Sequence, residues 1–369
     1  MMKNWEQYKI DRKQILKNKM VEDGVDGILF HSSINRQWFT NFSTTEGYLL
    51  FSDKAIILYL DGRYITAGKE QAANVDEIKL MPTNSQNAFI ELLSNDLKNN
   101  NIKTLGFESE YTNFDEYFKL KTQLKNFVLK PMNVNQIRTI KDGEEIQKIN
   151  GACEIADKAF ASVLKKIKSG MREKEIEAII ASSFILNGAD GVSFNSIVVS
   201  GKRGALPHGR ATNKIIEKGD YVTIDFGCIF EGYCSDTTRT ICIEQDNSKM
   251  NEIYAVVAQA QKLGIEAVKP GVTTKQIDDI CREYITKAGY GEYFIHSTGH
   301  GLGVEVHEFP RVSPFCDVPL KPGMVITVEP GIYIPDLGGV RIEDDILVTF
   351  EGYEVLSKAP KTLDKPIIV

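Results

Sequence analysis

Apolar residues recur with two different spacings along the first third of the chain. Amphipathic stretches at helical spacing predict helices, and short apolar runs bounded by turn residues predict strands. These patterns give helices at residues 5–23, from Ile65, and at 113–124, and strands at residues 27–30, 48–51, 55–60 and 102–108. Because strands alternate with helices, we expect a small α/β domain over residues 1–130. Its one histidine, His31, has no cluster of acids near it in the sequence, so we expect a cap or an oligomerisation module.

A second domain follows this region. Pro131-Met-Asn-Val134 interrupts the pattern, so we place a linker at residues 131–143. Asp142 can cap a helix in which Glu145 completes a capping box, and the apolar spacing carries this helix to about Lys168. A chain of 369 residues is too long for one ordinary core, and residues 144–369 then form the second domain.

An internal repeat divides the second domain. Lys168-Ser-Gly170, followed by a helical pattern, recurs as Lys269-Pro-Gly271 with the same pattern after it. A strand that leads from a turn glycine to Asp225 recurs as a strand that leads to Glu329. Alternation along each strand puts a threonine and the final carboxylate on the same face. The two copies therefore place an acid at the same position.

Each of these strands continues into a hairpin whose return arm brings a second acid. A turn centred on Phe230-Glu231 would put Asp225 opposite Asp236, where Cβ atoms about 5 Å apart are normal. A glycine-containing loop would do the same for Glu329 and Glu343. Two such hairpins, one from each repeat, predict a site on a pseudo-twofold axis that carries four carboxylates.

Four buried carboxylates need positive charge beside them, because like charges in a low-dielectric site are costly or force protonation. No lysine lies on these strands, and Arg341 alone is too little. Divalent metal is the simplest solution, since four carboxylates and one imidazole suffice for two metals that share bridging acids. Acids on solvated strand faces are the alternative, which the matched positions on otherwise apolar strands disfavour.

One segment concentrates histidine. Residues 296–311 contain three of the chain's five histidines, with glycines at positions 299, 301 and 303. His296 and His300 have the spacing of two ligands on one helical face, but the glycines argue against a helix. We expect extended or turn structure in which His296, His300 and His307 have separate parts and the backbone approaches a buried site closely. For any one of them, a hydrogen-bonded core residue is the ordinary alternative.

Composition narrows the class of partner. Charged residues make up 25% of the chain and the net charge is −6, which disfavours nucleic acid and anionic membranes as obligatory partners. No apolar run approaches the roughly 20 residues that span a bilayer, so we expect a cytoplasmic protein. The six cysteines show no C-x-x-C pair, which predicts reduced thiols.

Four short motifs occur in order in the second domain: Leu206-Pro-His208-Gly, Thr298-Gly-His300-Gly, Val306-His307-Glu-Phe-Pro310 and Val340-Arg-Ile-Glu343-Asp. With them the chain resembles the metal-dependent pita-bread peptidases, which include methionine aminopeptidase, aminopeptidase P and prolidase, with creatine amidinohydrolase as a non-peptidase relative. The His-Glu-x-Pro segment and the creatinase-type N-terminal domain resemble the Xaa-Pro branch. His307-Glu308 is not a zincin motif, because Arg311 stands where that motif needs a second histidine.

The resemblance implies a mixed α/β (α+β) fold, with a creatinase-like α/β N-terminal domain before a pseudo-twofold pita-bread catalytic domain. It also implies a metal site. Asp225, Asp236 and Glu343 would hold one divalent metal, and Asp236 and Glu343 would bridge to a second metal that His300 and Glu329 complete. An oxygen-rich site with one imidazole suits manganese better than zinc, although cobalt or iron would also fit.

The remaining site residues would act on the substrate. His208 and His307 would donate hydrogen bonds to the substrate and to the developing oxyanion. Glu329 would carry a proton from water to the nitrogen of proline. His296 would touch the substrate. Arg341, grouped with the substrate-binding residues and on the same strand face as Glu343, would orient the metal-binding carboxylates.

The substrates implied by the resemblance are short proline-containing peptides, cleaved by a homodimer in which residues 1–130 cap the site of a neighbouring protomer. Arg311 would bind the free carboxylate of a dipeptide that ends in proline through two parallel hydrogen bonds, which favours an Xaa-Pro dipeptidase (prolidase). Three alternatives stay open: aminopeptidase P acting on longer peptides, a creatinase-like C–N hydrolase, and a non-catalytic binding protein of the same fold. The last is disfavoured because all five metal positions are present.

Overall fold

The computed structural model describes the chain except for residues 1–4, 6 and 83–85, and it divides into two compact units. Residues 10–137 form the N-terminal unit. Residues 138–369, together with the described part of residues 1–9, form the second unit. No helix among the described residues is long and apolar enough to cross a membrane.

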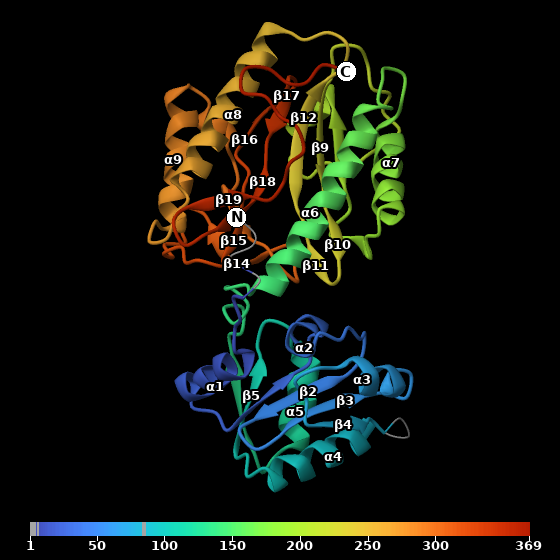
Figure 1. Ribbon diagram of the computed structural model, residues 1–369, viewed down its shortest axis with the longest axis vertical. Coiled ribbons are helices and arrows are strands. Elements are labelled where there is room, and N and C mark those ends of the chain that lie inside the picture. The colour runs from blue at the N-terminus through green and yellow to red at the C-terminus, as the bar shows by residue number, and fades with distance from the viewer. Residues whose placement is uncertain (1–4, 6, 83–85) are drawn as a thin grey trace. The chain divides into compact units, whose positions relative to one another are not determined.

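The N-terminal unit has α/β structure, as predicted. Its strands are β1 (Gly27–Phe30), β2 (Tyr48–Ser52), β3 (Ile56–Leu60), β4 (Glu77–Leu80), β5 (Thr104–Glu108) and β6 (Val128–Met132). Its helices are α1 (Arg12–Asp23), α2 (Ser33–Thr40), α3 (Ile65–Gln71), α4 (Gln86–Asn99) and α5 (Phe114–Gln123). The strands form one mixed sheet in the order β4-β3-β2-β1-β5-β6 (Figure 1). The predicted hairpin of β2 and β3 and the helices near Ile65 and after Asn113 are confirmed.

The start of α1 differs from its prediction. The helix begins at Arg12, because the side chain of Asp11 accepts a hydrogen bond from the backbone N–H of Gln14 and so caps the first turn. The predicted start at residue 5 is therefore wrong, and residue 6 lies outside the described residues. The predicted end is confirmed, since Gly24 adopts the left-handed conformation that stops a helix.

One other expectation for this unit is wrong. Pro131 and Met132 belong to β6, which pairs in parallel with β5, so the linker does not begin there. β6 is an edge strand, where a proline without an N–H group is tolerated. His31 also has an acid partner, because its Nδ1 lies 2.6 Å from Glu116 Oε1 while its ring stacks on Tyr48.

The second unit is built from two halves of similar construction. The strands of the first half are β7 (Gly191–Val192), β8 (Ile197–Ser200), β9 (Tyr221–Phe226), β10 (Cys228–Phe230), β11 (Tyr233–Cys234) and β12 (Thr237–Cys242). Those of the second half are β13 (Gly299–Gly301), β14 (Glu308–Val312), β15 (Val325–Val328), β16 (Gly331–Ile334), β17 (Gly338–Arg341), β18 (Asp344–Val348) and β19 (Tyr353–Val355). The helices are α6 (Gly143–Leu164), α7 (Glu173–Leu186), α8 (Ser248–Ala267) and α9 (Thr274–Lys287).

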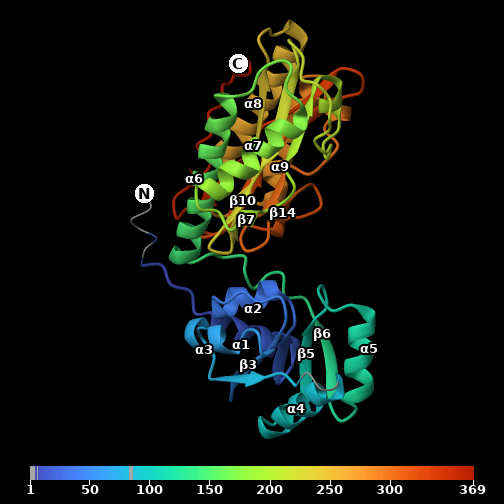
Figure 2. The ribbon, with the colours of Figure 1, turned by 90° about the vertical axis from the view of Figure 1, so that its right-hand side faces the viewer.

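Each half has its own apolar core between a helix pair and its strands. In the first half, Phe160 of α6 and Ile180 of α7 pack into one cluster with Ile224 of β9. In the second half, the corresponding cluster contains residues of α8, α9, β15 and β18. The pair α6 and α7 and the pair α8 and α9 consequently flank the strands on two sides (Figures 1 and 2). The strands between them carry the acids.

The predicted repeat is confirmed in detail. α7 and α9 are both 14 residues long. The glycines that precede them, Gly170 and Gly271, have φ angles of 89° and 90°, and the turn glycines Gly219 and Gly323 both have 87°. Glycine adopts such positive φ angles without steric cost, which explains why the same residue stands at matched positions. The predicted capping box at Asp142 is also present, although α6 ends at Leu164 rather than near residue 168.

The first hairpin has a different register from the predicted one. Its turn lies at Glu231-Gly232, where both φ angles are positive, as a two-residue type I′ turn requires. Asp225 therefore lies opposite Thr238 and not opposite Asp236. Because the register differs by two residues, Asp236 still lies on the same face of the hairpin as Asp225.

The second hairpin has the predicted register. Val328 pairs with Asp344 between β15 and β18, and β16 pairs with β17 in the continuing register. Glu329 and Glu343 consequently lie opposite each other, at the point where one pair of strands gives way to the next.

Candidate metal centre

The five residues expected as metal ligands come from both halves of the second unit. Asp225 lies on β9 and Asp236 directly before β12. His300 lies on β13, Glu329 directly after β15 and Glu343 directly before β18. The segment around His300 is extended, as the glycines around it predicted.

The ligand atoms of these residues lie close together. Atoms of Asp225, Asp236 and Glu343 are within 4.8 Å of one another, and so are atoms of His300, Glu329 and Glu343. Asp236 also has an oxygen 3.6 Å from His300 Nε2. Glu343 therefore belongs to both groups, and Asp236 reaches from the first group towards the second. The structure brings together all five side chains.

Burial leaves the acids in need of a cation. Among the described residues, Asp225 Oδ1, Asp236 Oδ1 and Glu343 Oε1 are buried without a hydrogen-bond partner. Burial and neighbouring carboxylates raise the pKa of Asp236 and the pKa of Glu343 well above their ordinary values, and burial also raises the pKa of Asp225. Divalent cations would pair with the orphaned oxygens and stabilise the charged carboxylates. The donor set therefore fits divalent metal ions.

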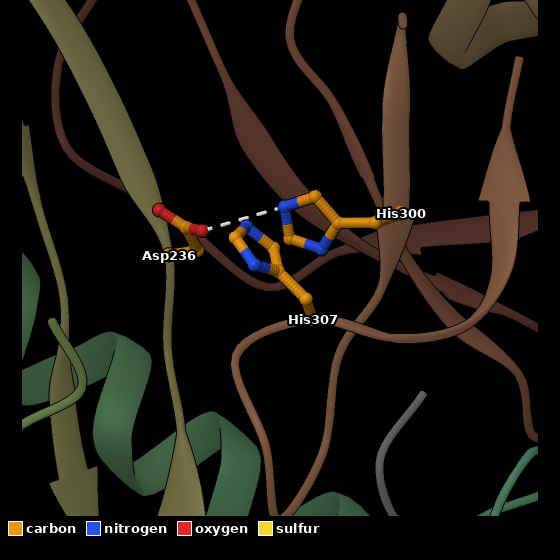
Figure 3. A group of neighbouring side chains, drawn as sticks. All are labelled: Asp236, His300 and His307. Atoms are coloured by element: carbon orange, nitrogen blue, oxygen red, sulfur yellow. Dashed lines mark ion pairs between the residues drawn. The ribbon is translucent and has the colours of Figure 1, made fainter. Parts of the chain in front are cut away.

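His300 turns its Nε2 towards the acids. This atom lies 3.6 Å from Asp236 Oδ2 (Figure 3) and 3.3 Å from Glu329 Oε1. Its Nδ1 lies 3.0 Å from the carbonyl oxygen of Gly301, and a proton on Nδ1 leaves the Nε2 lone pair available to a metal. When no metal occupies Nε2 and His300 is protonated, burial still raises the pKa of Glu329, but the hydrogen bond and charge of His300 outweigh it and lower that pKa to about 2. Glu329 is therefore ionised at neutral pH.

His307 stands next to His300. The ring centroids are 4.3 Å apart and the planes nearly perpendicular (Figure 3). A ligand atom of His307 lies within 4.8 Å of atoms of Asp236 and His300. Burial, with the charge of His300, lowers the pKa of His307 to about 4, so the ring is neutral at pH 7 and can donate one hydrogen bond. This position suits a hydrogen-bond donor and also a ligand, and metal content in a variant separates the two.

Arg341 connects the first acid to His296 through Tyr333. Its Nη2 donates to Asp225 Oδ2 at 2.6 Å, and its Nη1 donates to Tyr333 Oη at 2.8 Å. Tyr333 Oη in turn lies 2.9 Å from His296 Nε2. Nη1 also donates to the carbonyl oxygen of Pro207 at 3.2 Å. The guanidinium thus orients Asp225, and its hydrogen bond to Pro207 fixes the backbone directly before His208.

His208 and Arg311 are exposed residues at this site. Burial lowers the pKa of His296 and of His307. The residue before His208, Pro207, accepts a hydrogen bond from Arg341 Nη1, which places this segment beside the site. Arg311 lies directly opposite His300 in the β13–β14 pair. Because opposite residues of an antiparallel pair share a face, the Arg311 side chain leaves its strand on the same face as that of His300.

Three residues of the site were missed in the sequence. Thr238 donates to Glu343 Oε2 at 2.6 Å, and Asp345 accepts the backbone N–H of Asp236 at 3.0 Å. These two lie two positions beyond Asp236 and Glu343, so strand alternation could have found them. Tyr333, the third, had no such signal, because only the folded hairpin brings it to the site.

The two halves of the second unit contribute acids to one carboxylate-rich site. Hydrolases use sites of this kind to bind metal ions. Residues 147–350 match metallopeptidase family M24, and residues 12–140 match the creatinase/prolidase N-terminal domain. The chain belongs to metallopeptidase family M24 and carries this N-terminal domain. The family predicted from the four motifs is confirmed.

Relatives with known names resemble the chain over nearly its whole length. The "Xaa-Pro dipeptidase" of Pyrococcus furiosus is 41% identical over 96% of this chain and 99% of its own. The solved structure of an "Xaa-Pro dipeptidase" from Bacillus anthracis has a TM-score of 0.92, 41% identity, and coverage of 97% of this chain and 99% of that one. An "X-Pro aminopeptidase" structure from Thermotoga maritima has a TM-score of 0.88, 35% identity, and coverage of 97% and 100%.

Proposed function

We propose that the protein is an Xaa-Pro dipeptidase, which hydrolyses the peptide bond before a C-terminal proline. The observation that supports this choice is the backbone register, in which Arg311 lies opposite His300. From this position its guanidinium would reach a substrate bound at the metal centre. A guanidinium binds a free carboxylate through two parallel hydrogen bonds, whereas the amide of a longer peptide offers no such partner. The names of the Pyrococcus and Bacillus relatives support the same choice.

Two divalent ions would be held by the five clustered residues. Asp225, Asp236 and Glu343 would bind one ion, and His300 and Glu329 would bind the other together with the shared acids Asp236 and Glu343. Such ions, when bound, make water nucleophilic near neutral pH and polarise a carbonyl group. The oxygen-rich donor set favours manganese, with cobalt, zinc or iron as other occupants.

The chain's own residues would move the proton and hold the substrate. An amide nitrogen leaves only as a neutral amine, so the nitrogen of the Xaa-Pro bond must receive a proton before proline leaves. Glu329, ionised at neutral pH, would accept a proton from the attacking water and pass it to this nitrogen. His208 and the neutral His307 would donate hydrogen bonds to the substrate and to the developing oxyanion.

The other two residues would order the site. His296 would contact the substrate with its ring held by Tyr333. Arg341 would orient Asp225 through their hydrogen bond and so fix the direction from which this carboxylate binds metal. The homodimer and the cytoplasmic location stay predictions from the sequence.

A substrate panel tests this proposal. The full-length protein, reconstituted with Mn²⁺, should cleave Xaa-Pro with a higher kcat/KM than Xaa-Pro-amide or Xaa-Pro-Yaa, and it should leave creatine intact. A preference for Xaa-Pro-Yaa would make the protein an aminopeptidase P, the alternative supported by the Thermotoga relative's name. Cleavage of creatine would indicate a C–N hydrolase, and turnover of none of these compounds would indicate a binding protein.

A further inference from the structure

The carboxylate of Glu308 is buried between two cations. Glu308 follows His307 directly, and its side chain is 1% exposed. Oε1 accepts a hydrogen bond from Arg138 Nε at 3.0 Å, and Oε2 accepts one from Lys141 Nζ at 3.0 Å. The side chains of Arg138 and Lys141 are 2% and 1% exposed. We call these three side chains the Glu308 anchor.

The anchor also fixes the backbone that leads to His307. Glu308 Oε1 accepts the backbone N–H of Glu305 at 3.2 Å, and Arg138 Nη2 donates to the side chain of Glu305 at 2.5 Å. A Cβ atom on Gly303 would lie only 2.6 Å from Glu308 Oε2, so only glycine lets the chain pass this close to the carboxylate. The segment from Gly303 to Glu308 is consequently folded around one charged group.

Lys141, one of the two cations of the Glu308 anchor, is fixed through its own backbone. The backbone N–H of Lys141 donates to the carbonyl oxygen of Gly323 at 2.8 Å, in the turn before β15. The next residue, Asp142, caps α6. Burial raises the pKa of Glu308, but Lys141 and Arg138 outweigh it and lower that pKa below the ordinary value. Glu308 is therefore an ionised anchor point, and it is not poised to exchange a proton at neutral pH.

We propose that Glu308, Arg138 and Lys141 are positioning residues, which hold the His307 ring beside His300 and so set its hydrogen bond to the reacting substrate. This role deepens the proposed function and rests on it for the identity of the substrate. Glu308 would then act through His307 and would not touch the substrate. Arg138 and Lys141, at the start of the second unit, would thus hold the loop that carries His307.

Lys141→Met tests the anchor by removing one of its two cations. Misplacement of a catalytic group by about 1 Å can cost up to 100-fold, so we expect kcat on Xaa-Pro to fall between about tenfold and 100-fold, with KM changed less than about twofold. Both metals should remain bound, because no ligand is touched. Glu308→Gln, which keeps the shape and removes the charge, should show the same pattern.

Lys79→Met is the matched control. Lys79 Nζ lies 2.6 Å from Asp96 Oδ1 in the N-terminal unit, where the carboxylate is also largely buried. The same substitution there removes a similar ion pair without any link to His307. Its kcat should stay within about twofold of the wild-type value. Equal losses of kcat in both lysine variants would overturn the proposal, as would loss of metal from Lys141→Met.

A double variant separates positioning from general stability. If the anchor acts through His307, adding Lys141→Met to His307→Ala should lower kcat less than about twofold further, because residues that act as a unit are not additive. Losses that multiply would overturn the proposal.

Hydrogen exchange gives a readout that needs no turnover. The backbone amides of residues 303–308 should exchange faster in Lys141→Met than in the wild-type protein, and at the wild-type rate in Lys79→Met. Unchanged exchange in Lys141→Met would overturn the proposal, whereas a wild-type protein inactive on every peptide would overturn the proposed function alone.

Discussion

The two halves of the second unit share a skeleton and differ in the chemistry they carry. Both have a positive-φ glycine before a 14-residue helix, and both place a threonine and then an acid on the central strand. The first half supplies Asp225, Asp236 and His208 to the site. The second half supplies the remaining residues: His296, His300, His307, Arg311, Glu329, Arg341 and Glu343. Duplication thus fixes where the acids lie, whereas the groups expected to act on substrate come mainly from the second copy.

Strand pairing explains part of this difference. In the first half, β9 and β12 form one ladder through Asp225, and it gives way to the β10–β11 pair at Gly227 and Asp236. In the second half the ladder breaks between β15–β18 and β16–β17, and the break falls at Glu329 and Glu343. Both acids of the second half therefore lie outside the regular ladder, where Glu329 faces His300 and Glu343 lies close to His300, to Glu329 and to the acids of the first half.

The largest effect should come from the two shared acids, one from each half. Asp236→Ala and Glu343→Ala should each abolish peptide hydrolysis and release metal, because each carboxylate would bridge the two proposed metal ions. Mn²⁺ should raise the midpoint of thermal unfolding of the wild-type protein and leave both variants unchanged, since only a folded state that binds the ion is stabilised. Asp279→Ala, at a partly exposed acid of α9 that pairs with Lys275, is the control. Full metal content and turnover in either site variant would falsify the shared-acid arrangement.

The next effect compares a histidine from each half. His208→Ala and His307→Ala should retain both metals and lose kcat by a factor on the order of 10²–10³, the range for an oxyanion donor. Metal analysis beside steady-state kinetics checks both points. If His307→Ala loses metal, then His307 is a ligand, as its distance to Asp236 and His300 also allows.

A smaller effect concerns Arg311, which the second half supplies. Arg311→Ala should raise KM for Xaa-Pro by an amount equivalent to about 2–3 kcal/mol, the range for a charged hydrogen bond, and should barely affect Xaa-Pro-amide. Arg172→Ala, at an exposed arginine of the first half, should change neither substrate. Equal losses of Arg311→Ala on both substrates would leave aminopeptidase P as the better assignment.

The smallest effect tests the shared skeleton. Gly170→Ala and Gly271→Ala should each destabilise the protein by about 1–2 kcal/mol, because an L-residue at positive φ is strained. No neighbouring atom lies within 4 Å of the added Cβ atoms, so the strain comes from the backbone alone. Thermal unfolding should show two similar decreases with kcat unchanged. A large difference between the variants would mean that the two positions are not equivalent.

The sequence by itself determined the repeat, the family and the cluster of four acids with His300. Glycine at positive φ, alternation along strands and capping residues are local effects, so their signals survive in the linear chain. Even the wrong register of the first hairpin left Asp225 and Asp236 on one face, since a shift of two residues preserves the side of a strand.

The tertiary structure decided what depends on contacts between distant segments. It extended the N-terminal sheet through Pro131, because a parallel edge strand is defined by its partner and not by its own composition. It brought Tyr333 between Arg341 and His296, and it placed Arg138 and Lys141 around Glu308 across more than 160 residues of chain. Buried charges must find partners wherever the fold supplies them, and their pairing therefore follows from packing and not from spacing along the sequence.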